Sequence, residues 1–116
     1  MSKQKLAELY KKATALGLEV LVEVHDKEEL RIAEALSAQL IGVNNRNLKT
    51  FDVSIGVSQT LGEKQKTDTV YISESGFSTS EQVALVKENY RVVLVGEGLM
   101  RETDPKAKVK ALQVLR

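Results

Sequence analysis

The residues best suited to chemistry follow four short apolar runs. Carboxylates can exchange protons with a bound molecule, an asparagine amide can hold a hydroxyl or carboxylate, and an arginine can bind an anion through several donors. Glycines let a ligand approach the backbone closely. The four groups are Glu23 with His25, Asn44 to Arg46, Glu74 to Gly76, and Gly96 to Gly98. Because they are spread along the chain, we expect a site assembled from several elements.

Two of these residues are carboxylates placed inside or at the end of an apolar stretch. Glu23 lies in VLVEVH and Glu74 in YISES. A carboxylate in such a place is costly unless it is paired or belongs to a site, so both are predicted to be functional. A structural ion pair is the alternative for Glu23. His25, the single histidine, is more typical of a loop or helix start than of direct catalysis.

The remaining candidates each have a functional and a structural interpretation. Asn44 follows LIGV and either grips a ligand or closes an Asx turn. Arg46 either binds an anion or braces its loop by pairing with Glu23 or Asp52. Gly76 and Gly96 each follow a strand and precede a helix, where free backbone amides favour an anion such as phosphate.

Helical and strand-like segments alternate along the whole chain. The predicted helices cover 3–16, 28–38, 53–62, 81–89 and 105–115, with a short helical turn at 96–100, and the predicted strands cover 18–24, 40–43, 69–73 and 91–95. Capping residues support the helix starts: Asp26 with Glu29, a choice of Ser78, Thr79 or Ser80, and Asp104 before Pro105.

This alternation predicts an α/β fold, a parallel (βα)4 sheet with a leading helix. The strands are continuously apolar rather than alternating, as in parallel sheets covered on at least one face. Ligands bind at the carboxyl edge of such sheets. The four polar groups are therefore expected to converge there.

Composition narrows the possible functions. The 116 residues suit one unit, and 17 basic against 16 acidic residues give a net charge of +1, which disfavours nucleic acid and membrane surfaces as partners. There is no cysteine and one histidine, so thiol chemistry and a multi-histidine metal site are excluded within the chain. No signal-like or membrane-length apolar run occurs, so a cytoplasmic location is expected.

Four segments carry a family resemblance that covers nearly the whole chain. They are EVLVEVHD at 19–26, LIGVNNRNLKTFDV at 40–53, ISESGFST at 72–79 and VLVGEGLMRETDP at 93–105. Together they closely resemble the second half of indole-3-glycerol phosphate synthase, a (βα)8 TIM-barrel lyase of tryptophan biosynthesis. The resemblance implies that the chain is half of a TIM barrel, strands five to eight, with residues 3–16 as the fourth helix.

The resemblance also implies roles for single residues. Glu23 would take part in proton transfer near the reacting ring, while Asn44 and Glu74, with Ser75 beside them, would hold substrate and orient the catalytic lysine. Arg46 would lie near the anthranilate carboxylate. Gly76, Gly96, Glu97 and Gly98 would form the phosphate cradle. The implied reaction converts 1-(2-carboxyphenylamino)-1-deoxyribulose 5-phosphate to indole-3-glycerol phosphate, carbon dioxide and water, without cofactor or metal.

The family's catalytic lysines and a further glutamate lie on earlier strands, for which these 116 residues have no counterpart. No lysine here replaces them by motif. We therefore expect the chain alone to lack synthase activity. A half-barrel also leaves open edges and an uncovered apolar face, which predicts association with the missing amino-terminal half or with a second copy of the chain.

Two alternatives remain. A non-catalytic half-barrel could bind phosphate or serve in assembly. A flavodoxin-like receiver has a suitable length, but its strand ends carry paired aspartates and an acceptor aspartate, whereas these carry Glu23, Asn44 and Glu74.

Overall fold

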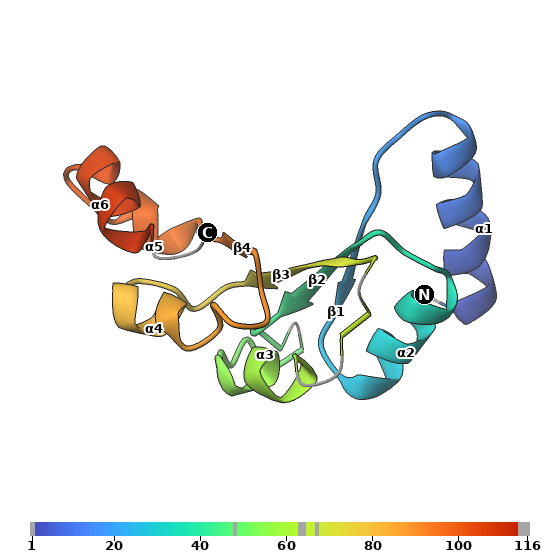
Figure 1. Ribbon diagram of the computed structural model, residues 1–116, viewed down its shortest axis with the longest axis horizontal. Coiled ribbons are helices and arrows are strands. Elements are labelled where there is room, and N and C mark those ends of the chain that lie inside the picture. Colours follow the sequence, from blue (N-terminus) through green and yellow to red (C-terminus); the bar gives the residue numbers. More distant parts are fainter. Residues whose placement is uncertain (1, 48, 63–64, 67, 114–116) are drawn as a thin grey trace.

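The computed structural model describes residues 2–47, 49–62, 65–66 and 68–113. Four parallel strands form one sheet in the order β1-β2-β3-β4 (Figure 1). Each strand pairs with the next one in the sequence, as in a barrel wall, whereas a flavodoxin-like sheet places its second strand outside its first. The predicted half-barrel is confirmed and the receiver-like alternative is excluded. The strands are β1 (Leu21–Val24), β2 (Leu40–Asn44), β3 (Val70–Glu74) and β4 (Val92–Leu94).

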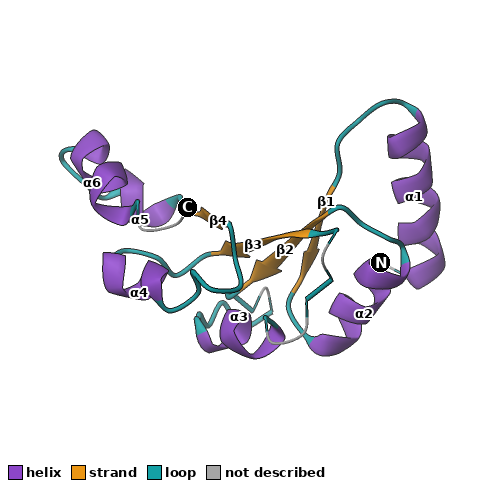
Figure 2. Cartoon of the chain, in the orientation of Figure 1, coloured by secondary structure: helices purple, strands orange, loops and turns teal. Residues whose placement is uncertain are grey.

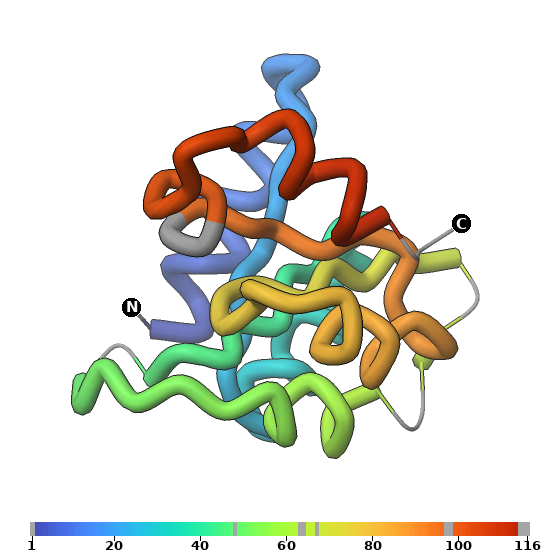
Figure 3. The backbone as a smooth tube through the Cα atoms, turned by 90° about the vertical axis from the view of Figure 1, so that its left-hand side faces the viewer, coloured from blue at the N-terminus to red at the C-terminus, as the bar shows by residue number. Residues whose placement is uncertain are grey.

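Helices α2, α3 and α4 lie along one side of the sheet (Figure 2). Helix α1 stands beyond β1, and α5 and α6 lie at the β4 end. Seen from that end, α6, drawn in red, lies in the upper part of the view, and α3, drawn in yellow-green, lies at the bottom (Figure 3). In the described residues the helices are α1 (Lys3–Ala15), α2 (Lys27–Ala35), α3 (Gly56–Leu61), α4 (Ser80–Ala84), α5 (Glu97–Met100) and α6 (Pro105–Leu112).

The outer strands are shorter than predicted. β1 begins at Leu21, where it meets Leu40, the first residue of β2. An edge strand has a neighbour on one side only. Leu18 and Val20 therefore favour a strand, but the described ladder between β1 and β2 begins only at Leu21. α4 ends at Ala84, before the predicted 89, and residues 114–115 of the last predicted helix lie outside the described part of the chain.

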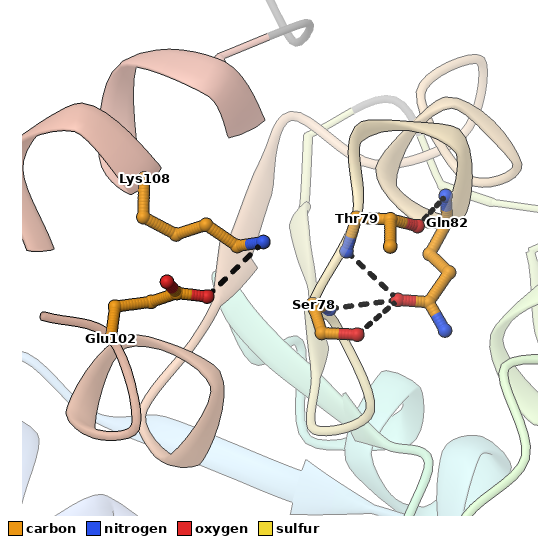
Figure 4. A network of polar contacts seen from close by, with 5 residues as sticks. All are labelled: Ser78, Thr79, Gln82, Glu102 and Lys108. Carbon is orange, nitrogen blue, oxygen red and sulfur yellow. Dashed lines mark hydrogen bonds and ion pairs between the residues drawn. The ribbon is translucent and has the colours of Figure 1, made fainter. Parts of the chain in front are cut away.

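The predicted caps are formed. Asp26 accepts from the Glu29 amide at 2.8 Å, and the Glu29 carboxylate accepts from the His25 amide at 2.7 Å. Of the three candidates for α4, Thr79 is the cap. Its hydroxyl and the Gln82 side chain complete a capping box (Figure 4). The same view shows an ion pair of 3.4 Å between Lys108 and Glu102 near the start of α6.

Strand register separates the two faces of the sheet. Val22, Ile41 and Tyr71 belong to the face on which the helices pack, and all three are buried. The opposite face carries Leu21, exposed by 42%, and Leu94, exposed by 54%. The uncovered apolar face predicted for a half-barrel is therefore present among the described residues.

At the amino-terminal end of the sheet, a hydrogen-bonded cluster joins β3 to α2. The Tyr71 hydroxyl donates to Glu34 Oε2 at 2.6 Å and accepts from the Lys66 amide at 3.1 Å. Burial, and then the bond to Glu34, raise the pKa of Tyr71. The cluster lies at the end of the strands opposite the candidate site, so it stabilises the sheet.

Replacing Tyr71 with phenylalanine is expected to lower the free energy of unfolding by about 1 to 2 kcal/mol, because it leaves two polar partners unpaired. Urea unfolding would measure this. Tyr10→Phe is the matched control, since no hydrogen bond of the Tyr10 hydroxyl is found in the described residues, and it should change stability by less than about 0.5 kcal/mol. Equal effects of the two substitutions would contradict the assignment.

Candidate active site

Two carboxylates meet at the carboxyl end of the sheet. Glu23 on β1 and Glu74 on β3 lie on the uncovered face, two strands apart. Glu23 is exposed, whereas Glu74 is buried with only 3% of its surface accessible. Burial raises the pKa of Glu74 to about 8, and hydrogen bonding and charge repulsion from Glu23 act in the same direction. Glu74 is therefore largely protonated at neutral pH and can donate a proton.

This raised pKa makes stability depend on pH. The folded chain binds a proton at Glu74 that the unfolded chain releases near its ordinary value of 4.5, so stability falls as pH rises from about 4.5 to about 8. Glu74→Gln cannot ionise. It is expected to be more stable than the unsubstituted chain at pH 9, by roughly 1 to 3 kcal/mol, and similar to it at pH 4. Urea midpoints measured at both pH values test this, and a difference independent of pH would contradict it.

Asn44 ends β2 beside Glu74 in the sheet register. Its Oδ1 accepts from the Arg46 amide at 2.9 Å, which closes the Asx turn, and from the Ser75 hydroxyl at 3.0 Å. Because a backbone amide can only donate, the Asn44 side-chain atom that faces the Arg46 amide must be the oxygen Oδ1. The nitrogen Nδ2 therefore faces away from the Arg46 amide. No described residue accepts from that nitrogen. The turn and the ligand-gripping role, first considered as alternatives, are thus compatible.

Ser75 and Gly76 both adopt left-handed backbone conformations, with φ of 74° and 89°. A serine in this region is strained by about 1 kcal/mol or more. Two hydrogen bonds hold it there. The Ser75 hydroxyl donates to Asn44, and Asn45 Nδ2 donates to the Ser75 carbonyl at 3.1 Å. Ser75 and Gly76 both line a cavity.

That cavity, of about 660 Å³, lies between the ends of β3 and β4. Arg46, Ser75, Gly76, Gly96 and Arg101 contribute to its wall. Two of the four predicted cradle residues, Gly76 and Gly96, thus line one cavity together with two arginines. One of these arginines, Arg101, was not indicated by the motifs. Glu97 and Gly98 lie in the first turn of α5, and the structure describes their backbone only.

The two uncertain candidates have structural contacts. Arg46 donates from Nη1 to the Phe51 carbonyl at 3.2 Å and so braces its loop, while also lining the cavity. His25 Nδ1 lies 2.7 Å from the Asn44 carbonyl oxygen. A carbonyl only accepts, so this nitrogen carries the proton, and the ring holds the end of β2 in place.

Sequence reasoning missed a buried polar network behind the site. Asn45 is fully buried, and its Nδ2 donates to Ser73 Oγ and to the Ser75 carbonyl, each at 3.1 Å. Its Oδ1 accepts from the Ser58 amide at 3.0 Å. Asn45 therefore fixes the strained turn at Ser75 against α3. The available signal was Ser73, a polar residue on the apolar side of β3, which requires a partner.

Lys49 is a second residue near the site that the sequence did not indicate. An Asx turn at Asn47, whose Oδ1 accepts from the Lys49 amide at 2.9 Å, bends the loop after β2. Lys49 then lines a cavity of about 260 Å³ together with Glu23 and Asn44. No motif indicates such a position for a loop lysine.

Comparison with known proteins decides the family of this chain. The family model described as indole-3-glycerol phosphate synthase matches residues 1–112. The chain belongs to this family. An indole-3-glycerol phosphate synthase of Listeria monocytogenes serovar 1/2a is 55% identical over all 116 residues, and one of Streptococcus mutans serotype c is 47% identical over 114.

The chain spans about half the length of these synthases. It covers 46% of the Listeria relative and 45% of the Streptococcus relative, at their carboxyl-terminal part. A solved structure, titled as the BexX/CysO complex of Amycolatopsis orientalis, has a TM-score of 0.71 and 18% identity. The match covers 96% of this chain and 46% of the chain in that structure, and it supports the fold alone. Among the described residues, no helix is long and apolar enough to cross a membrane.

Proposed function

We propose that this chain supplies the carboxyl-terminal half of an indole-3-glycerol phosphate synthase active site. The observation that carries the proposal is the convergence of Glu23, Asn44 and Glu74 at one sheet edge in a chain of this family. The reaction is ring closure with decarboxylation and dehydration of 1-(2-carboxyphenylamino)-1-deoxyribulose 5-phosphate. The remaining half of the barrel must provide the family's lysines.

The two carboxyls suit the proton transfers of this reaction. Ring closure delivers a proton to the ketone oxygen, and dehydration needs another when the hydroxyl leaves as water. Glu74, protonated near neutral pH because burial raises its pKa to about 8, suits the donor role. Glu23, exposed on the same face, suits the acceptor role. The buried environment of Glu74 and the exposed environment of Glu23 thus suit the two glutamates to different roles, proton donor and proton acceptor.

The other polar groups suit substrate binding. Asn44 has its oxygen engaged by Arg46 and Ser75, which leaves its amide nitrogen to donate to a substrate oxygen. Arg46, on the wall of the large cavity, suits the anthranilate carboxylate. The backbone around Gly76, Gly96, Glu97 and Gly98 suits the phosphate, because a glycine backbone lets an anion approach the amides.

Activity on mixing tests this proposal. The chain and a separately produced amino-terminal part of the Listeria relative are each expected to form no indole-3-glycerol phosphate, while the mixture forms it. No cofactor or metal should be needed, so the activity should survive dialysis against a chelator. Product formation by the chain alone, or a stable complex without turnover, would contradict the proposal.

The uncovered face supports an assembly role for the isolated chain. Leu21, Val92 and Leu94 are each exposed by more than 40%, on the face that would line a barrel. Burying them in the absence of the other half requires a second copy of the chain. We expect a homodimer or larger assembly by size-exclusion chromatography with light scattering. A stable monomer at micromolar concentrations would contradict this.

A phosphate-binding half-barrel without catalysis is the second candidate, favoured by the cavity that joins Gly76 to Gly96. Titration with inorganic phosphate, followed by amide NMR, separates the two proposals. Shifts confined to Gly76 and to 96–99, with no turnover in the mixture, would favour this candidate. Absence of shifts at millimolar phosphate would exclude it.

A further inference from the structure

Gly42 lies in β2, the strand between β1, which carries Glu23, and β3, which carries Glu74. It pairs with Glu23 on β1 and with Ile72 on β3, and Glu74 stands two residues further along β3 on the same face. Alternate strands lie roughly 9 to 10 Å apart in a sheet. The Glu74 carboxyl lies over Gly42, within this span, and from there it interacts with Glu23.

Any side chain on residue 42 would take the space over β2 that the Glu74 carboxyl occupies. A Cβ placed on Gly42 would lie 1.6 Å from Glu74 Oε2 and 2.8 Å from Glu74 Cδ. Gly42 is not among the described glycines with a positive φ, so the backbone itself does not require glycine here. What the position requires is space, and the Glu74 carboxyl occupies it.

We propose that Gly42 is a positioning residue: the space that it leaves lays the Glu74 carboxyl across β2 against Glu23, so that the two carboxyls share one proton. Glu74 Oε2 is buried and has no hydrogen-bond donor among the described residues. An ionised Glu74 would leave this oxygen unpaired, whereas a protonated one can donate to the Glu23 carboxylate.

Among the described residues, Glu23 is the one charged group that raises the pKa of Glu74. Lys49 lines the small cavity beside Glu23, but Glu74 does not belong to the wall of that cavity. The neighbours of Glu74 in register are Asn44 on β2, which does not titrate, and Leu94 on β4, which is apolar. On β1 the facing group is Glu23, and helices α2 to α4 pack on the other side of the sheet. Burial and Glu23 together raise the pKa of Glu74, in agreement with a shared proton.

Carboxyl-carbon NMR of the full 116-residue chain tests this inference. The Glu74 resonance is expected to titrate near pH 8, and in Gly42→Ala its midpoint should fall by at least one pH unit toward 4.5. The added methyl meets the tip of a flexible side chain, so the strands can stay in place. Gly56→Ala is the matched control, because its Cβ approaches only Ser54 Oγ, at 3.2 Å. An unchanged Glu74 midpoint in Gly42→Ala would overturn the proposal.

A double-mutant cycle tests the same point without relying on titration. If Gly42 serves to seat the carboxyl, Gly42→Ala should lower the urea midpoint of the chain clearly less in a Glu74→Ala background than with Glu74 present. Equal shifts in both backgrounds would overturn the proposal.

The inference rests on the proposed function only in placing the pair in an active site. The titration needs no turnover, so an inactive completed enzyme would refute the proposed function and leave the role of Gly42 intact. A Glu74 midpoint near 4.5 in an active completed enzyme would refute the role of Gly42 and leave the proposed function intact.

Discussion

Glu23→Gln and Glu74→Gln are each expected to lower kcat of the enzyme completed with the amino-terminal half by about 10²- to 10⁴-fold. Each keeps the size and the polarity of the side chain but removes its ability to exchange a proton. The pair acts as a unit across Gly42, so the double substitution should cost little more than the worse single one. Steady-state assays of product formation measure both effects.

Glu28→Gln provides the control for this experiment. Glu28 is exposed on the first turn of α2 and lines none of the cavities at the strand ends. Its substitution should leave kcat within about twofold. Retention of full activity in either Glu23→Gln or Glu74→Gln would mean that the pair does not carry the proton transfers.

Asn45→Ala should produce the largest loss of stability, about 2 to 5 kcal/mol. It leaves the Ser58 amide and the Ser75 carbonyl without their partner in a fully buried place, and it opens a void behind β3. Since Asn45 also holds the left-handed turn at Ser75, the loss should extend to phosphate affinity at the neighbouring cavity. Urea unfolding and phosphate titration by NMR measure the two consequences.

Asn89→Ala, at an exposed position, is the matched substitution and should change stability by less than about 0.5 kcal/mol. If Asn45→Ala were as mild, the buried network would not be what fixes the Ser75 turn.

The sequence predicted the fold well because its signals are local. Apolar runs and the caps at Asp26, Thr79 and Asp104 each act within a few residues, and together they specify the order of the elements. Strand length depends on partners far along the chain. Leu18 and Val20 continue the apolar pattern of β1 toward the amino terminus, yet in the described sheet residues 18–20 have no neighbour with which to pair.

The site was predictable in part for the same reason. Glu23, Asn44 and Glu74 could be placed at one edge because parallel strands end together. Gly42 looked like an ordinary residue of a buried strand, and its role became visible only when a carboxyl from another strand was found over it. Lys49 depends on the path of a loop, which a turn at Asn47 determines. Such positions require tertiary structure.

A chimera tests the central claim most directly. The carboxyl-terminal 46% of the Listeria relative, which this chain matches at 55% identity, would be replaced by these 116 residues. Covalent linkage removes association of the halves as a variable, so turnover reports on the site alone. We predict that the chimera forms indole-3-glycerol phosphate and that Glu23→Gln within it abolishes most of that activity. A folded chimera without turnover, or one whose turnover is unaffected by Glu23→Gln, would contradict the account.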